Sequence, residues 1–364
     1  MAESLKKRKG FLEMDISILG VNLGEKVIFS KHLAVMLRSG MPITEAFDIS
    51  IDATQGKLKK ILKGIRLSIQ AGHSLSDSFA NYPKTFSELF INVTRAGEKS
   101  GTLVENLENI AEELRKEKEL ISKIKGALLY PIIVLIATFA LGMVLAFVVL
   151  PKITPLFEGL KIDLPATTRS LIWLSNVIQD HGFYIFWGIV AFFIFIAWLI
   201  RQEFSKPVTH LIMIRVPILR TLIRNANLAR FSRTLGMLIK SGVNIDEALN
   251  ITKATMGNYY FRRAIGNVAH RASMGVKLTD GLEESSDLFP KLFTRMVHVG
   301  EESGKFEDTL FYLATLYEAE VDTSTKSLST ALEPMLLIFI GLVVGFLALS
   351  IITPIYNVTG NIKR

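Results

Sequence analysis

The chain has 364 residues, of which 49% are apolar and 21% charged, with 42 lysines and arginines against 34 aspartates and glutamates. This length predicts two or three domains, and the net charge of +8 is modest for a chain of this size. No cysteine occurs in the sequence, which excludes disulfides, zinc–thiolate sites and thiol nucleophiles.

Residues 1–24 begin basic and become apolar, as a secretory signal would. Glu13 and Asp15 interrupt the apolar part, and no small-residue cleavage site follows an uncharged core, so a signal peptide is rejected. We expect a basic amphipathic tail that is either solvated or in contact with anionic lipid or a partner.

Residues 25–126 are predicted to form a cytoplasmic bundle of helices. Apolar residues recur with near-helical spacing over Val27–Arg38, and Ser39-Gly40 ends that run. Similar patterns without strand-like alternation occur over residues 45–53, 58–69 and 88–96.

The motif "GEKSG" at residues 97–101 is predicted to end the last of these helices at residue 96. Gly97 and Gly101 both permit positive φ angles, which would allow the chain to turn sharply at this point.

A long helix is predicted to follow, from Thr102 to Leu150. Thr102 and Glu105 fit a capping box at its start, and Pro131 is expected to kink it without ending it. Such a helix could reach from the bundle through the bilayer.

Three stretches are predicted to be transmembrane helices. Residues 127–150 provide 24 residues without a charge and residues 183–200 provide 18, while residues 335–353 follow the pair Glu333-Pro334.

The positive-inside rule orients these three spans. Five lysines and arginines lie in the fifteen residues before the first span and two in the fifteen after it, whereas one precedes the second span and three follow it. Charges near the third span weakly favour the opposite orientation. We follow the first two spans, because successive spans must alternate in direction. We therefore expect a cytoplasmic N-terminus, an extracytoplasmic loop and tail at residues 151–182 and 354–364, and a linker with a second cytoplasmic bundle at residues 201–334.

The two bundles are predicted to be copies of one another. Residues 29–49 align with residues 231–251 at an offset of 202, which places Glu45 on Glu247. After one inserted residue the offset becomes 203, and it then pairs Gly97, Glu98, Ser100, Gly101 and Pro131 with Gly300, Glu301, Ser303, Gly304 and Pro334. Agreement over about 125 residues indicates an internal duplication.

The sequence carries none of the common catalytic or nucleotide-binding patterns. There is no GxxxxGK[ST] phosphate loop, and the six histidines are scattered without an HxxxH or HExxH pair. We therefore expect neither enzymatic activity nor a cofactor. The predicted spans contain no ionisable side chain, which argues against ion transport. Glu333, just before the third span, is interpreted as a hydrated carboxylate.

Glu98 and Glu301 allow two interpretations. Carboxylates near helix N-termini are stabilised by the helix dipole, which alone could account for both. Alternatively, they contact a partner or form a weak cation site, with Asp77 and Asp280 as co-ligands.

Basic helix faces are interpreted as solvated surface. They lack an aromatic stacking platform, so nucleic-acid binding is not expected. These faces carry Arg224, Arg230, Arg233, Lys57, Lys59, Lys60 and Lys63.

The chain resembles the polytopic platform protein of type IV pilus and type II secretion systems, the PilC/GspF family. The resemblance covers nearly all of residues 25–358 and rests on "MLRSGMPITEAF" with "MLIKSGVNIDEAL", "AGEKSGTL" with "VGEESGKF", "LLYP" with "LEP", and "LPATTRSLIWLSN". It implies an all-α membrane protein of the inner membrane, with two duplicated cytoplasmic helical-bundle domains and three transmembrane helices.

The same resemblance implies a non-enzymatic role in assembly. Such a platform docks a cytoplasmic hexameric ATPase and passes its motion to pilin subunits, alongside other inner-membrane assembly proteins, lipids and further copies of itself. The family-motif and candidate partner-contact residues are Gly97, Glu98, Ser100, Gly101, Gly300, Glu301, Ser303, Gly304, Glu45, Glu247, Pro131, Glu333 and Pro334.

Three alternatives stay open beside the pilus platform, which is preferred because the chain is short and simple. One is the platform of a type II secretion system. The others are a transporter or channel subunit, whose polar path would have to arise by oligomerisation, and a membrane enzyme acting on prepilins.

Overall fold

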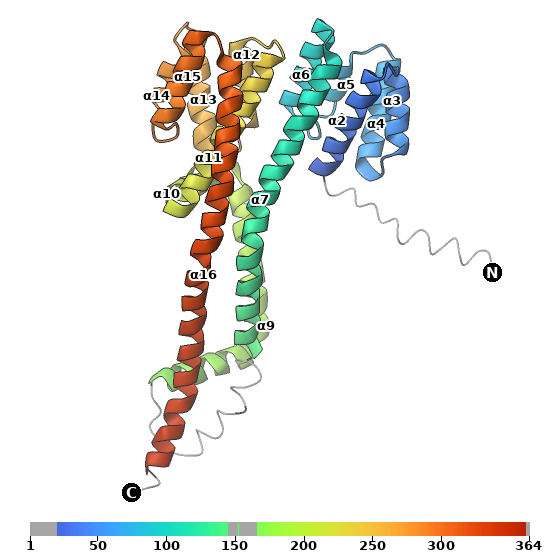
Figure 1. Ribbon diagram of the computed structural model, residues 1–364. Coiled ribbons are helices and arrows are strands. Elements are labelled where there is room, and N and C mark those ends of the chain that lie inside the picture. The colour runs from blue at the N-terminus through green and yellow to red at the C-terminus, as the bar shows by residue number, and fades with distance from the viewer. Residues whose placement is uncertain (1–19, 145–151, 153–165, 362–364) are drawn as a thin grey trace, which may run out of the picture. The chain divides into compact units, whose positions relative to one another are not determined.

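The computed structural model describes residues 20–144, 152 and 166–361. Within these residues all regular secondary structure is helical and no strand occurs, so the described chain is all-α (Figure 1). The expectations for most of the N-terminal tail, for residues 145–150 of the first span and for the loop up to residue 165 lie outside the described residues.

Two sets of five helices recur in the same order. The first helix set consists of α2 (Leu23–Arg38), α3 (Ile43–Asp52), α4 (Gly56–Gln70), α5 (Leu75–Ala80) and α6 (Glu88–Ser100). The second helix set consists of α11 (Pro217–Lys240), α12 (Ile245–Thr255), α13 (Tyr259–Ala272), α14 (Leu278–Glu283) and α15 (Lys291–Ser303).

Each set is followed by one long helix. These are α7 (Leu103–Val144), which has 42 residues, and α16 (Phe306–Asn361), which has 56. Between them lie α9 (Ala166–Arg201), the short η2 (Glu203–Ser205) and α10 (Lys206–Arg215). The predicted helices over residues 27–38, 45–53 and 58–69 are confirmed, whereas the six-residue α5 was not predicted.

Local sequence explains where these helices begin and end. Asn22 and Glu25 form a reciprocal capping box at the start of α2, and the side chains of Ser74 and Ser87 accept hydrogen bonds from the first turns of α5 and α6. Gly40, which follows α2, has a φ angle of 83°, so this helix ends through a left-handed residue as expected.

Phenylalanine rings fill the centre of each helix set. In the first set, Phe79 packs against Phe86 and Phe90 with ring centroids 4.5 and 4.8 Å apart. In the second set, Phe231 and Phe293 both lie within 6 Å of Phe289. Such aromatic packing buries large apolar areas and stabilises short helices that would not persist alone.

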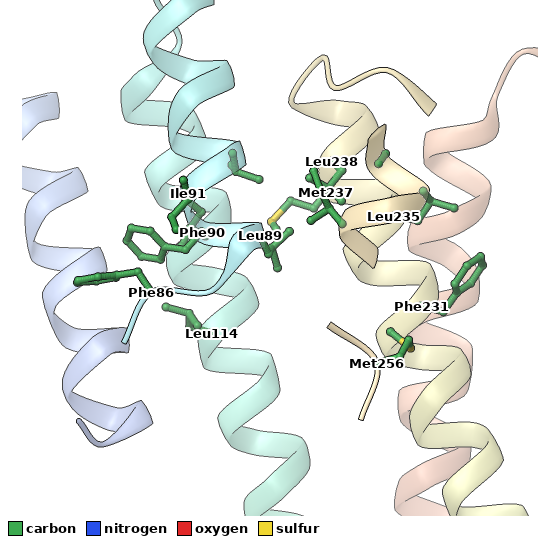
Figure 2. Close-up of a cluster of buried hydrophobic side chains, with 14 of the residues drawn as sticks. Phe86, Leu89, Phe90, Ile91, Leu114, Phe231, Leu235, Met237, Leu238 and Met256 are labelled. Carbon is green, nitrogen blue, oxygen red and sulfur yellow. The ribbon is translucent and has the colours of Figure 1, made fainter. Parts of the chain in front are cut away.

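The described chain divides into two compact units. One contains the described residues up to Ser122 together with Met213–Val321, and therefore both helix sets; the other contains Lys123–Ile212 and the residues from Asp322 onward. Buried residues of both helix sets belong to one hydrophobic cluster, in which Leu89 of the first set lies near Met237 of the second (Figure 2).

The long helices differ in extent from the predicted spans. α7 is continuous from Leu103 through Pro131 to Val144, as predicted up to that residue. α9 begins at Ala166, so residues 166–182, predicted as part of an extracytoplasmic loop, are helical and continuous with the predicted second span.

Candidate functional site: repeated turns and a charged helix junction

The two glycine-bracketed motifs end α6 and α15. Gly101 and Gly304 follow the last residues of these helices with φ angles of 75° and 68°. A Cβ atom added to either glycine would meet nothing within 4 Å, so what selects glycine here is backbone conformation. The prediction that Gly101 has a positive φ angle is confirmed.

The prediction for Gly97 is wrong. α6 continues to Ser100 instead of ending at residue 96, and Gly97 is a buried residue inside the helix. A Cβ atom on Gly97 would lie 2.9 Å from the Cα atom of Leu103 and 3.0 Å from Nδ2 of Asn106. Gly97 therefore allows α7 to approach α6 closely, which is a packing role.

Gly300 has the same role in the second helix set. An added Cβ atom would lie 2.8 Å from Oγ1 of Thr309 and 2.9 Å from its Cβ atom, so α16 passes close to α15 at this residue. Each motif thus combines one glycine for close approach with one for the left-handed turn.

The carboxylate of each motif caps a short helix of its own set. Oε1 of Glu98 accepts the N–H of Leu75 at 2.5 Å, and its Oε2 accepts the N–H of Ser76 at 3.0 Å. These N–H groups begin α5, where they have no partner within the helix. The carboxylate thereby fixes the start of α5 to the end of α6.

Glu301 repeats this arrangement. It accepts the N–H of Leu278 at 2.8 Å, and both the N–H and the hydroxyl of Thr279 at 3.2 and 2.7 Å. The helix-dipole interpretation thus describes contacts that both glutamates make. Their role as contacts for a partner stays a prediction.

The other predicted site residues are dispersed. Ser100 donates a hydrogen bond to the carbonyl of Ala96, and Oγ of Ser303 accepts the N–H of Lys305. The remaining members are Glu45 and Glu247, exposed in the first turns of α3 and α12, and Pro131, Glu333 and Pro334, which lie within α7 and α16.

The structure does not gather acids around the proposed weak cation site. Asp77 pairs with Arg95 at 3.4 Å, while Glu98 contacts backbone N–H groups. Among the described residues, no group of three or more histidine, aspartate or glutamate side chains is placed to hold a metal ion.

A charged junction that the sequence analysis missed joins α7, α11 and α16. It consists of Glu113, Arg233 and Glu318. The guanidinium of Arg233 lies 2.5 Å from Oε1 of Glu318 and 3.9 Å from Oε2 of Glu113, and its side chain is only 13% exposed. The interpretation of Arg233 as solvated surface is therefore wrong.

Further ionic contacts extend the junction along the same helices. They are Arg230 with Glu117 at 3.5 Å, Lys116 with Glu318 at 3.6 Å and Lys240 with Glu105 at 4.0 Å. Acids of α7 thus face bases of α11 over several turns. A charged helix face in the sequence could have suggested such pairing, but nothing in it identified the partner helix.

Glu113 is the member of the junction whose negative charge is destabilised by burial. Burial raises the pKa of Glu113 to about 7, because the attraction of Arg233 offsets only part of the cost of removing the carboxylate from water. The neighbouring Glu117 adds to the increase. Oε2 of Glu113 is buried and accepts no hydrogen bond within the described part of the chain.

Two helical stretches of the described chain have the length and composition of membrane spans. They are α7 and the segment Asp180–Ile200 of α9, and the most apolar part of each is not buried within the described chain. A shorter apolar stretch, Leu336–Phe346, lies in α16. The first two stretches overlap the first and second predicted spans.

Comparison with known proteins gives a consistent family. The family model described as type II secretion system protein F matches twice, at residues 29–151 and 231–354. Type IV pilus assembly protein PilC of Thermus thermophilus is 34% identical over 94% of this chain and 85% of its own length. PilC of Pseudomonas aeruginosa is 30% identical over 95% and 94%, and type II secretion system protein F of Aeromonas hydrophila is 29% identical over 94% and 89%.

Proposed function

Because this chain belongs to the type II secretion system protein F family, we propose that it is the inner-membrane platform of a type IV pilus assembly machine. In this role it couples a cytoplasmic hexameric ATPase to the extraction of pilins from the membrane and their polymerisation. The observation that carries the proposal is the continuity of α7 and α16, each of which leads from a helix set into an apolar stretch.

The proposed topology has three spans. To the two long apolar stretches of α7 and α9 it adds residues 335–353, which include the apolar stretch Leu336–Phe346. The N-terminus and both helix sets lie in the cytoplasm, and residues 151–182 and 354–364 lie outside. The asymmetry of lysines and arginines at the first two spans supports this orientation.

The two helix sets are, in this proposal, duplicated cytoplasmic domains. The double match of one family model and the repeated order of five helices support the duplication. Duplication gives one chain two related surfaces that a moving partner can contact.

Coupling needs a surface for the ATPase and a stiff path to the membrane. The exposed lysines of α4 are the first candidates for the surface, because the carboxylates of Glu98 and Glu301 already bind backbone N–H groups. Ionic contacts of α11 supply the path, because Arg233 pairs with Glu318 of α16 and Arg230 pairs with Glu117 of α7, the two helices that continue into apolar stretches.

Type II secretion is the second candidate, since relatives of both kinds match nearly the whole chain. Relatives named for pilus or fimbrial assembly range from 29% to 34% identity, and those named for type II secretion range from 27% to 30%. This difference favours the pilus. We further propose that the chain uses no cofactor and catalyses no reaction, the energy coming from its ATPase partner.

The test is a deletion strain with a purified-protein assay beside it. Deletion should abolish surface pili, and the full-length gene should restore them. The purified protein should hydrolyse no ATP by itself. Normal piliation in the deletion strain, or ATP hydrolysis that persists after copurifying ATPases are removed, would contradict the proposal.

A further inference from the structure

The two helix sets touch through a defined apolar contact. α6 of the first set packs against α11 and α12 of the second. Leu89 of α6 lies beside Met237 of α11 (Figure 2). Both belong to the buried cluster that also contains Ile251 of α12. We call this the set contact. It uses the α6 face of the first set and the α11–α12 face of the second.

Because the two sets match in sequence, the first set has a counterpart of the α11–α12 face, and the second set has a counterpart of the α6 face. Neither counterpart takes part in the set contact. Leu292 on α15 matches Leu89, and Val35 on α2 and Ile49 on α3 match Met237 and Ile251. Leu89 and Met237 of the set contact are 9% and 3% exposed, and Ile251 of α12 is 4% exposed. Their counterparts Leu292, Val35 and Ile49 are 59%, 54% and 45% exposed.

Single exposed apolar residues are ordinary and need no explanation. Here, however, three buried residues each have an exposed counterpart in the other helix set. Val299, two helical turns after Leu292 on α15, and Tyr312 on α16 are also apolar and 57% exposed. Clustered apolar exposure of this kind marks an interaction surface.

The charged residues beside the set contact also have counterparts in the other helix set. In the set contact, Glu105 of α7 faces Lys240 of α11 at 4.0 Å. The matching residues are Asp308 of α16 and Arg38 of α2, both exposed, and they keep the acid and the base on corresponding helices. Arg38 also pairs with Glu108 of its own chain. Because Arg38 is exposed, it remains accessible to an acid of a second molecule.

We propose that a second copy of this chain occupies these faces. The α15–α16 face of one molecule docks on the α2–α3 face of another and repeats the set contact between molecules. This contact joins unlike faces, so it generates a closed ring or a continuing row, and not a two-fold dimer. The inference goes beyond the proposed function and does not depend on it.

The absence of cysteine from the sequence makes disulfide cross-linking a direct test. Two tagged versions of the full chain are coexpressed in membranes, one carrying Val35→Cys and the other Leu292→Cys. Oxidation should join the two versions, because these positions match Met237 and Leu89 (Figure 2). Leu89→Cys with Met237→Cys in one molecule gives the positive control.

Leu67→Cys replaces Val35→Cys as the matched control, since Leu67 on α4 is also apolar and is 63% exposed, against 54% for Val35. A cross-link between positions 35 and 292 above that control supports the proposal. Cross-linking no higher than the control would overturn it, and so would dominant products between two molecules that both carry Val35→Cys, because those indicate a two-fold contact.

A charge exchange tests the same register without cysteines. Arg38→Glu or Asp308→Arg alone should lower self-association, measured by copurification of two tagged versions, about two- to fivefold. The two changes combined should restore it, because the acid and base then face each other again. An additive loss in the double variant would overturn the proposed pairing.

Discussion

Gly97 and Gly101 stand in the same short motif but are glycine for different physical reasons. Gly101 has a positive φ angle and open space around it, whereas Gly97 is helical and lies against Leu103 and Asn106. From the sequence alone both were expected to have positive φ angles. A glycine in a sequence does not reveal whether it is required by a positive φ angle or by close packing against another helix. The packing partner becomes visible only when α7 is in place.

Gly101→Val should destabilise the protein by about 1–2 kcal/mol, because a β-branched residue is strained at positive φ. Gly101→Asn should cost less, since asparagine tolerates the left-handed region. Thermal unfolding of the detergent-solubilised protein measures both, with Ser100→Ala as a control outside the constraint. Equal, negligible effects of all three substitutions on the unfolding temperature would show that the turn does not require glycine at position 101.

Gly97→Ala should destabilise the protein for a different reason. Its new Cβ atom would lie 2.9 Å from the backbone of Leu103, so α6 and α7 must separate, at a cost of about 1–3 kcal/mol. Gly126→Ala in α7 is the matched control, because a Cβ atom there meets nothing within 4 Å. Unfolding temperatures of the two variants that do not differ would contradict the close-approach role.

At the scale of helices, the features that the sequence predicted correctly are those that depend on residues close together in the chain. The stops at Gly40 and Gly101 and the unbroken course of α7 follow from periodicity and glycine, and they were predicted. Arg233 was interpreted as solvated because its partners, Glu113 and Glu318, are remote in sequence and meet it only when three helices pack. Tertiary pairing of this kind has no local pattern.

The buried carboxyl of Glu113 predicts a pH dependence. Its pKa is raised by burial, so its contribution to folding is fully present below the ordinary pKa of glutamate and is lost as pH rises through about 7. Glu113→Gln should therefore match the parent at pH 4.5 and exceed it at pH 8 by about 1–3 kcal/mol. Unfolding temperatures across this pH range measure the difference.

Glu112→Gln is the control with the opposite sign. The hydrogen bond from Arg115 lowers the pKa of Glu112, whose side chain is half exposed, so replacing it should bring no gain in stability at pH 8. A Glu113→Gln variant whose unfolding temperature follows that of the parent at every pH would show that burial does not strain this carboxyl.

At the scale of the whole molecule, the topology predicts which positions are accessible from outside. Single cysteines replace Lys60 in α4 and Leu160 in the proposed outer loop of this cysteine-free chain. An impermeant maleimide should label intact cells at position 160 and not at position 60, and both positions after the cells are opened. Labelling of intact cells at 60 but not at 160 would contradict the orientation.

The measurement that tests the coupling role most directly is the amount of assembly ATPase that the full-length protein retains on purification. Lys57→Glu with Lys63→Glu reverses two exposed charges of α4, and Lys99→Glu with Lys305→Glu makes the same charge change elsewhere. We predict that the α4 variant retains about tenfold less ATPase and forms no surface pili, while it still folds and inserts into the membrane. ATPase retention and piliation equal to those of the control variant would contradict α4 as the ATPase surface, and no ATPase retained even by the unmodified protein would contradict the coupling role itself.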